Sequence, residues 1–430
     1  MDPDVKYLLS LRAIRDRAQL VWRAAKAGDL THFDLHLDKL GHAADFVISV
    51  IQRDFGPDQY GTIPPHGRWQ HFEVGNVPRV QKMIDAWKSI GVDDKEVARR
   101  LIDLFFVSVL LDAGAGDYWR FVEPETDKKY ERSEGIAVAS FYMFNAGDFA
   151  DPSAGVSTSV DGNGLKTMTA EKLGSGFQVS DSNPILGLVS RAALLRSLGE
   201  SLLEHPEVFG SQGRPGNLVD YMIQSSNDPS ELDLLKFWDV LQMLLIPAWP
   251  KDRTSVRGFA IGDAWPLSTL KNYSEPSKDD ATSCIQPFHK LTQWLTYSLM
   301  VPFQRILGIK WKNTESLTAL AEYRNGGLFV DLGIITLKKE AYDRGIKASG
   351  QELPQFGAGD DVIVEWRALT LNLLDKVYEI IGSRLGDQAH LTMAQVLEAG
   401  TWKSGREIAA KLRPETKSSP IIIQSDGTVF

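Results

Sequence analysis

Two carboxylates and one arginine lie close together within residues 321–333, a stretch with largely apolar flanks. An uncompensated buried charge costs several kcal/mol, so charges in such a stretch must be paired, bound to a ligand or solvated in a cleft. Charged groups set into runs that look buried are typical of active sites. We therefore predict chemistry in this stretch, at Glu322, Tyr323, Arg324 and Asp331.

A second charged cluster interrupts the apolar run of residues 362–369. Starting from Val362, the helical spacing i, i+3, i+4, i+7 places Glu365 where an apolar side chain is expected. Contact with a ligand explains this placement, and so does a structural ion pair with Arg324, Arg367 or another helix. The sequence leaves both explanations open.

The helix expected to begin near Pro287 carries a polar and aromatic stripe at the same spacing. A lysine, an amide, an indole and a phenol on a helix with a buried pattern suit a polar ligand. The alternative is a solvated face on which two aromatic rings pack. The stripe consists of Lys290, Gln293, Trp294 and Tyr297.

Asp112 and Asp117 flank a glycine-rich turn after a buried-looking helix, and Trp119 follows closely. This arrangement predicts carboxylates and a stacking aromatic ring at the mouth of a pocket. The alternative is an ordinary helix C-terminal turn with glycines for backbone reasons. The glycine spacing matches neither a P-loop nor a dinucleotide-binding fingerprint.

Histidine and cysteine give little support for a metal. His32 and His36 stand four residues apart, near Asp34 and Asp38, which makes a metal site conceivable. No His-Glu-x-x-His string occurs, however, and charged helix faces are usually solvated. Cys284 is the only cysteine, which excludes an intrachain disulfide and a cysteine-based metal site. We expect no metal and no cofactor.

Helical periodicity predominates in the elements that must position these residues. We predict a mainly α fold with minor β structure near the C-terminus, built as a single helical catalytic domain over residues 1–430. An N-terminal helical subdomain over 1–100 is an alternative division. Loops are expected over 147–187. Helices are predicted over 4–26, 34–53, 80–111, 134–146, 187–204, 231–245, 287–303, 315–324, 361–385 and 391–411.

Composition limits the partners. Lysine and arginine total 47 against 56 aspartate and glutamate, a net charge of -9. This balance argues against a nucleic-acid surface, because phosphate backbones favour basic patches. The longest apolar runs, such as 104–111, are too short to span a bilayer. The start of the chain also lacks the apolar core of a signal peptide. We expect a cytoplasmic protein without nucleic-acid or membrane partners.

Several long strings in this chain resemble the family of the fourth protein of the fungal and bacterial uracil-catabolism pathway. That family was long a domain of unknown function. The resemblance implies a pathway in which uracil, carried as a ribotide, is opened and degraded to urea and a three-carbon acid. The strings span nearly the whole chain: 111–117, 132–135, 287–299, 322–327, 400–407 and 425–430.

A fainter resemblance links three strings to the queuosine-salvage N-glycosidases, which are helical and related in fold to DNA glycosylases. Residues 290–293, 322–324 and 365–368 are similar to that family's motifs in order and approximate spacing. The family carries aspartate before its tyrosine–arginine pair, as a candidate active-site carboxylate. Glu322 stands at that position here and is one methylene longer.

These resemblances imply an N-ribosidase that cleaves a ribosylurea phosphate to urea and ribose 5-phosphate. Departure of nitrogen from a sugar builds oxocarbenium-like charge, which a carboxylate stabilises or attacks while an acid protonates the leaving nitrogen. We assign the first role to Glu322, and the role of acid or urea ligand to Asp112 or Asp117. Lys290 and Arg324 are expected to hold the phosphate. The predicted substrate-binding residues are Trp119, Glu134, His289, Lys290, Gln293, Trp294, Tyr323, Arg324, Asp331, Glu365 and Arg367.

In this scheme Glu365 orients Arg324 or binds a ribose hydroxyl. The expected ligand is a small molecule derived from a nucleoside or ribotide, and other uracil-catabolism enzymes are candidate partners. Two other functions stay open. One is an amidohydrolase acting on the opened pyrimidine or its ureido group, which normally needs a metal-activated water or an activated nucleophile. The other is a non-catalytic scaffold of the pathway.

Overall fold

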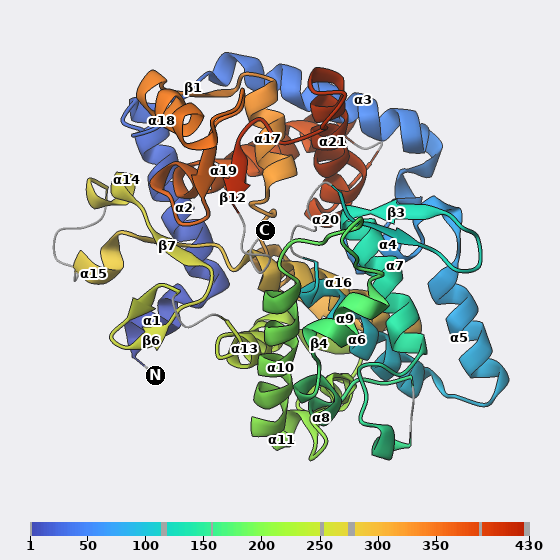
Figure 1. Cartoon of the computed structure of the whole chain (residues 1–430). Helices are drawn as coiled ribbons and strands as arrows, with labels where there is room; N and C mark the ends of the chain where they lie inside the picture. Colours follow the sequence, from blue (N-terminus) through green and yellow to red (C-terminus); the bar gives the residue numbers. More distant parts are fainter. Residues whose placement is uncertain are drawn as a thin grey trace. The chain divides into compact units, whose positions relative to one another are not determined.

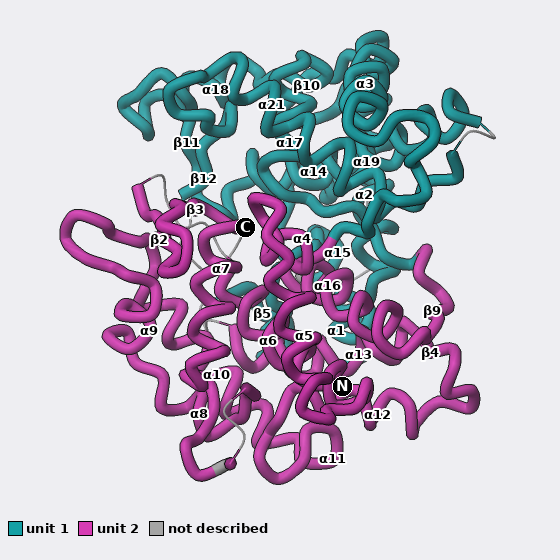
Figure 2. Tube along the Cα trace, turned by 90° about the vertical axis from the view of Figure 1, so that its right-hand side faces the viewer, with its two compact units in different colours: residues 1–66, 252–290, 316–425 teal, residues 67–251, 291–315, 426–430 magenta. Residues whose placement is uncertain are grey.

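The computed structural model describes residues 2–112, 118–155, 158–249, 253–273, 280–386 and 389–424 (Figure 1). These residues form two compact units, which are coloured separately in Figure 2. Each unit is assembled from segments that are distant in the sequence. The first unit comprises the described residues of 1–66, 252–290 and 316–425, and the second unit those of 67–251 and 291–315. The expected single catalytic domain over 1–430 stays a prediction.

The first unit contains ten α-helices among its described residues, with short strands and helical turns between them. Its elements are α1 (Pro3–Leu8), α2 (Leu11–Ala27), β1 (Phe33–Leu35), η1 (Leu37–Lys39), α3 (Leu40–Gln59), η2 (Tyr60–Thr62), β5 (Ser255–Val256), β6 (Phe259–Ala260), β7 (Ala264–Pro266), α14 (Ser268–Lys271), α15 (Asp280–Ser283), β8 (Ile285–Pro287), α17 (Tyr323–Asp331), β10 (Ile335–Leu337), α18 (Lys339–Ser349), β11 (Gln355–Gly357), α19 (Asp361–Leu385), α20 (Met393–Val396), the π-helix η8 (Leu397–Thr401), α21 (Trp402–Leu412) and β12 (Ile422–Gln424).

The second unit is also mainly helical. Its elements are α4 (Arg68–Phe72), η3 (Val74–Asn76), α5 (Arg79–Ser89), α6 (Asp94–Leu110), β2 (Arg120–Val122), β3 (Lys129–Glu131), α7 (Arg132–Asn145), η4 (Pro152–Ala154), α8 (Gly162–Lys166), α9 (Ala170–Gly176), α10 (Leu188–Glu204), α11 (Pro206–Phe209), η5 (Pro215–Asn217), α12 (Leu218–Gln224), β4 (Glu231–Asp233), α13 (Leu234–Leu245), α16 (Lys290–Leu307) and β9 (Lys310–Lys312). Lys290, the first residue of α16, is counted with the first unit, and η6 (Thr314–Ser316) spans the last boundary in the sequence.

The predicted mainly α fold is confirmed, because each sheet in the described part of the chain has only two strands. In the first unit β1 pairs with β10, β5 with β6 and β7 with β8, all antiparallel, while β11 pairs with β12 in parallel. In the second unit β2 and β3 are antiparallel and β4 and β9 are parallel. The predicted β structure near the C-terminus is therefore present as β12.

Helix α19 is the centre of the first unit. Every residue from Val362 to Leu374 is buried, as expected for a helix that other elements cover on all sides. Its neighbours include α2, α3 and α17, and α17 packs in turn against α21. A side chain at Gly405 of α21 cannot be accommodated, because its Cβ would lie 2.2 Å from the carbonyl oxygen of Arg324. This close contact holds α21 against the first turn of α17.

Helix α6 has the corresponding place in the second unit. Residues 101–110 are all buried, and α6 packs against α4, α7, α10 and α12. Residues 291–303 of α16 are buried too. The alternative of a solvated α16 face is therefore excluded, since Gln293, Trp294 and Tyr297 are 1%, 4% and 7% exposed.

A buried ion pair ties the β2–β3 hairpin to α5. The carboxylate of Glu123 accepts hydrogen bonds from Nε of Arg79 at 2.6 Å and from Nη2 at 2.9 Å. Burial alone raises the pKa of Glu123, but the bonds from Arg79 and from the Thr126 hydroxyl lower it to about 2. The carboxylate thus contributes stability at neutral pH, and this contribution is lost as the pH falls from 4.5 toward about 2.

Replacing Glu123 by glutamine is expected to lower the free energy of unfolding by about 3 kcal/mol, because it leaves the Arg79 guanidinium buried without its counter-charge. Chemical denaturation followed by circular dichroism measures the change. Glu131→Gln in the same hairpin is the control, since Glu131 and Arg120 form a pair with about half of each side chain exposed. That change is expected to cost less than about 1 kcal/mol. Equal losses in both variants contradict the prediction.

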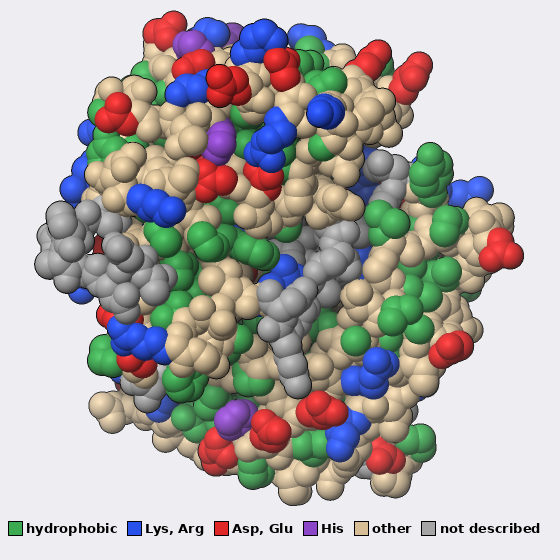
Figure 3. Space-filling view, turned by 60° about the vertical axis from the view of Figure 1, so that its left-hand side comes forward, with side chains coloured by type: hydrophobic (Ala, Val, Ile, Leu, Met, Phe, Trp, Pro, Cys, Tyr) green, Lys and Arg blue, Asp and Glu red, His purple; other side chains and the backbone are tan. Residues whose placement is uncertain are grey.

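The visible face in Figure 3 shows acidic and basic side chains interspersed, in keeping with 47 basic and 56 acidic residues. Of the helices that the structure describes, none combines the length and the apolar character needed to cross a membrane.

Candidate functional site

Glu322 is the N-cap of α17. The helix predicted over residues 315–324 is therefore wrong. The carboxylate accepts hydrogen bonds from the backbone nitrogens of Arg324 at 2.7 Å and Asn325 at 2.5 Å. Residues 317–321 run into this cap without helical structure and are all buried. An apolar run that is buried throughout has no periodicity to distinguish a helix from extended chain.

Charge and burial act in opposite directions on Glu322, which is 9% exposed. Burial raises its pKa above the ordinary value. The two backbone N–H bonds, Lys290 and Arg324 oppose this rise, because each favours the ionised form. The result is a carboxylate held in one orientation, with two cationic side chains acting on it. We call Glu322, Lys290 and Arg324 the Glu322 site.

Arg324 is positioned by the chain that follows α21. Its Nη1 donates to the carbonyl oxygen of Lys417 at 2.8 Å, and its guanidinium lies 4.9 Å from the centre of the Tyr323 ring. The side chain is only 5% exposed. Arg324 and Tyr323 therefore lie together at the start of α17, beside Glu322.

Asp331 does not join this group. It is the last residue of α17, about 13 Å along the helix axis from Glu322 by the standard rise per residue. Its carboxylate forms an ion pair with Arg413, with distances of 2.9 and 2.5 Å. The structure therefore gives Asp331 a role in fixing the segment after α21 rather than in the Glu322 site.

Glu365 has a different partner from the predicted one. Its carboxylate accepts bonds from the backbone nitrogens of Thr31 at 2.8 Å and His32 at 2.7 Å, and from the hydroxyl of Thr269. The side chain is completely buried. The expectation that Glu365 orients Arg324 or binds a ribose hydroxyl is corrected, because these three protein donors bind its oxygens and anchor the turn before β1.

Arg367 and His289 are likewise bound within the protein. Arg367 is 2% exposed and donates from both Nη atoms to Asp263 at 2.8 Å. His289 is 1% exposed, and its Nε2 lies 2.8 Å from the carbonyl oxygen of Leu8. Burial lowers the pKa of His289. The substrate contacts predicted for Arg367 and His289 stay predictions.

Asp263 was missed by the sequence analysis. It stands in a Gly-Asp-Ala-Trp turn, where aspartate is common for local reasons. The signal in the sequence that points to Asp263 is its apolar surroundings. Its neighbours Ile261 and Ala264 are apolar, and the structure shows both fully buried. Asp263 itself is 5% exposed.

In the second unit Asp112 is paired with a buried arginine. Nη1 of Arg68 donates to Oδ2 of Asp112 at 2.7 Å, and Nε and Nη2 of Arg68 bind the hydroxyl and carbonyl of Ser108. Burial lowers the pKa of Arg68, opposed by the charges of Asp112 and Glu134. Asp112 and Glu134 thus act on the same guanidinium. Their roles toward a substrate stay predictions, and Asp117 lies outside the described residues.

Trp119 is a core residue. It is fully buried, donates from Nε1 to the carbonyl oxygen of Phe177 at 2.9 Å and packs against the Phe177 ring. The prediction of a stacking ring at a pocket mouth is corrected for this side chain. Trp294 packs edge-on against His71, with ring centres 5.5 Å apart. The substrate contacts predicted for Gln293 and Trp294 stay predictions.

His32 and His36, the residues that made a metal site conceivable, each contact a different residue of the protein. His32 contacts Asp361 at 2.8 Å, and His36 contacts the hydroxyl of Thr336 at 3.2 Å. Within the described ranges, no group of three or more His, Cys, Asp or Glu side chains is placed to hold a metal ion.

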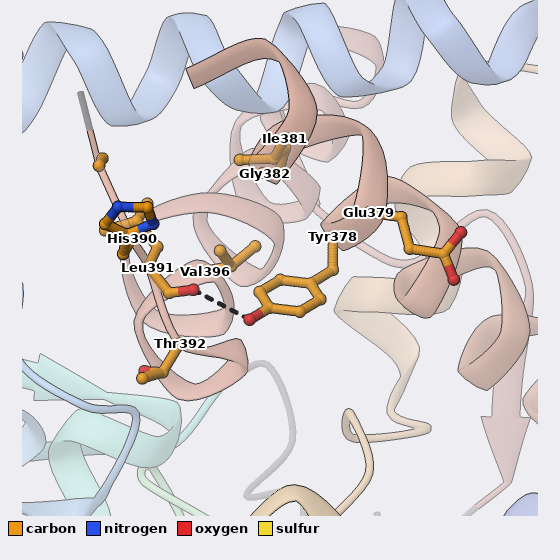
Figure 4. Close-up of a pocket in the computed structure, with 9 residues that line it drawn as sticks. Tyr378, Glu379, Ile381, Gly382, His390, Leu391, Thr392 and Val396 are labelled. Carbon is orange, nitrogen blue, oxygen red and sulfur yellow. Dashed lines mark hydrogen bonds between the residues drawn. The ribbon is translucent and has the colours of Figure 1, made fainter. Parts of the chain in front are cut away.

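A pocket of about 400 Å³ lies near the C-terminal end of α19 (Figure 4). The Tyr378 hydroxyl donates to the carbonyl oxygen of Leu391 at 3.0 Å, and both residues line the pocket. None of the sequence-predicted site residues is among the lining residues, which are Tyr378, Glu379, Ile381, Gly382, Ala389, His390, Leu391, Thr392 and Val396.

Fold and site together define a mainly helical protein with a buried, helix-capping carboxylate beside two basic side chains. A family model described as "Protein of unknown function (DUF1688)" matches residues 7–430, so the chain belongs to that family. The chain is 48% identical over 428 residues to "Protein urg3" of Schizosaccharomyces pombe, covering 99% of each chain. It is 43% identical over 444 residues to "Uracil catabolism protein 4" of Lachancea kluyveri, covering 100% of each.

Proposed function

We propose that this protein is an enzyme of uracil catabolism. The support is the name of the Lachancea kluyveri relative, uracil catabolism protein 4, which this chain matches from end to end at 43% identity. The proposed reaction is hydrolysis of the N-glycosidic bond of a ring-opened uracil ribotide, ribosylurea 5-phosphate. The bond between C1 of the ribose and the urea nitrogen breaks, and its electron pair stays on nitrogen. Water supplies a hydroxyl to C1 and a proton to nitrogen, which gives ribose 5-phosphate and urea.

The observation that carries this proposal is the geometry of Glu322. As C1 loses nitrogen it gains positive charge, and a carboxylate close to C1 lowers the energy of that state. Such stabilisation is most effective when the charge is already oriented and shielded from water. Glu322 meets both conditions, since two backbone N–H groups hold its oxygens and its side chain is 9% exposed. Lys290 and Arg324 supply positive charge for the 5-phosphate.

The experiment that tests the proposal uses purified protein treated with a chelator and enzymatically prepared ribosylurea 5-phosphate. Urea and ribose 5-phosphate are assayed separately. Release of both in equal amounts supports the N-ribosidase. Turnover of an intact ureido–amide bond instead, or turnover that requires added metal, assigns the protein to the amidohydrolases. No turnover of any ring-opened ribotide supports a scaffold.

The acid side of the pH profile is expected to report on Glu322. The carboxylate must be ionised to stabilise positive charge, so kcat/KM falls as the pH drops through its pKa. Because burial raises this pKa, activity is lost at a higher pH than the ordinary value of 4.5 predicts. The effect of pH on folding stability has the opposite sign. A carboxyl group whose pKa is raised in the folded state stabilises the fold at low pH, and this contribution is lost as the pH rises through the raised pKa. Circular dichroism at each pH separates the two effects, and full activity down to pH 4.5 contradicts the assignment.

A further inference from the structure

A continuous line of hydrogen bonds runs from Lys290 to the residue before Glu322. The backbone nitrogen of Lys290 donates to Oδ2 of Asp263 at 2.9 Å. Both Nη atoms of Arg367 donate to the same carboxylate at 2.8 Å. Nε of Arg367 donates in turn to the carbonyl oxygen of Ala321 at 3.1 Å. Two charged side chains thus bridge two segments that are about thirty residues apart in the sequence and that carry the Glu322 site.

The Lys290 end of this bridge includes a strained turn. His289 has a φ of 46°, in the left-handed region that non-glycine residues rarely adopt. The carbonyl oxygen of Asp263 accepts from the backbone nitrogens of Phe288 at 2.9 Å and His289 at 3.1 Å. Strain of this kind persists only where the surroundings impose it, and it concentrates at functional sites. Asp263 therefore holds both the strained turn and the first residue of α16.

The bridge is rigid and desolvated. Asp263 and Arg367 are 5% and 2% exposed, and the guanidinium lies 3.9 Å from the centre of the Phe288 ring. Nε1 of Trp265 donates to Oδ1 of Asp263 at 2.7 Å. Burial alone raises the pKa of Asp263, but Arg367 and the N–H donors bring it well below its usual range. The carboxylate is therefore charged and accepts four side-chain and backbone hydrogen bonds in a fixed geometry.

We infer that Asp263 is a positioning residue that, with Arg367, sets the separation between Lys290 and Glu322. The inference rests on the proposed function for the roles of Lys290 and Glu322. A purely structural ion pair also explains the burial. The positioning role, however, accounts for the three features together: the strained His289, the bond to the nitrogen of Lys290 and the bond to Ala321. A displacement of about 1 Å between reacting groups can cost about a hundredfold in rate.

The test moves the Asp263 carboxylate by one methylene without removing its charge. Asp263→Glu is expected to lower kcat on ribosylurea 5-phosphate by about tenfold or more, with a smaller change in KM, because the reacting groups are displaced while both remain present. Asp263→Asn is expected to lose more activity. Asp263→Glu is the primary variant because it keeps a negative charge for the buried Arg367, whereas Asp263→Asn removes it.

The matched control is Glu123→Asp, which moves a carboxylate by one methylene in another buried two-point arginine pair, that of Arg79. Both variants are compared at a temperature where circular dichroism shows them folded. Loss of kcat in Asp263→Glu with unchanged kcat in Glu123→Asp supports the positioning role. Activity of Asp263→Glu within twofold of the unmodified protein overturns it.

Hydrogen exchange distinguishes failure of this inference from failure of the proposed function. If the unmodified protein does not cleave ribosylurea 5-phosphate, the proposed function fails, and exchange alone tests the bridge. Faster exchange at the amides of Lys290 and of residues 322–325 in Asp263→Glu, and not in Glu123→Asp, supports the bridge. Unchanged exchange at these amides overturns it.

Discussion

Replacing Glu322 by glutamine is expected to lower kcat on ribosylurea 5-phosphate by at least about a thousandfold. Removal of a single preorganised group that stabilises transition-state charge commonly costs 10²- to 10³-fold, and Glu322 carries the full negative charge that opposes the positive charge at C1. Substrate affinity is expected to change little, because that positive charge develops only in the transition state. Single-turnover kinetics together with equilibrium binding to the inactive variant measure both quantities.

The control for this change must allow for the cap that Glu322 provides. Glutamine keeps one carbonyl oxygen for the two backbone donors at Arg324 and Asn325, so some stability is lost, about 1 kcal/mol. Asp360 offers a matched case: it caps α19 by accepting from the nitrogen of Val362 and pairs with Arg344. Asp360→Asn is expected to lose similar stability and to keep its activity. Full turnover by Glu322→Gln ends the assignment of Glu322.

The sequence was most informative where periodicity was strong. Helix α19 was predicted over 361–385 and has those bounds, because a long buried run with an aspartate before its first turn leaves little ambiguity. The buried positions on α16 were predicted for the same reason. Predictions failed in short buried runs such as residues 317–321, where the run is too short for its length to distinguish a helix from extended chain. The helix therefore begins eight residues later than predicted, and Glu322 caps it instead of lying inside it.

The rule that buried charges need partners predicted which charged residues have partners more reliably than it predicted what those partners are. Glu365 and Arg367 are buried and Asp331 is half-buried, and each of the three forms hydrogen bonds within the protein. Arg413 lies 82 residues from Asp331 in the sequence, and Asp263 lies 104 residues from Arg367. A single sequence contains no information about such distant pairs. It therefore cannot separate a charge that binds a ligand from one that binds another segment of the chain.

Lys290→Met is expected to remove most of the preference for a phosphorylated substrate. The proposed contact is a charge-assisted hydrogen bond between the ammonium group and the 5-phosphate, and loss of such a bond costs about 1.5–3 kcal/mol. This corresponds to a fall in kcat/KM of about ten- to a hundredfold for ribosylurea 5-phosphate. For ribosylurea without phosphate, kcat/KM is expected to stay nearly unchanged. Methionine keeps an unbranched apolar side chain, one atom shorter than lysine, and removes the charge.

The comparison between the two substrates separates two roles that the electrostatics of the site allow for Lys290. The alternative role is electrostatic, because Lys290 also favours the ionised form of Glu322. An effect through Glu322 lowers kcat/KM equally for both substrates and moves the acid side of the pH profile upward. An effect through the phosphate is confined to the phosphorylated substrate. Lys339→Met provides the control, because Lys339 is likewise the first residue of its helix and pairs only with the exposed Asp343 among the contacts described for it. Equal losses on both substrates therefore assign Lys290 to the carboxylate and leave Arg324 as the phosphate ligand to test.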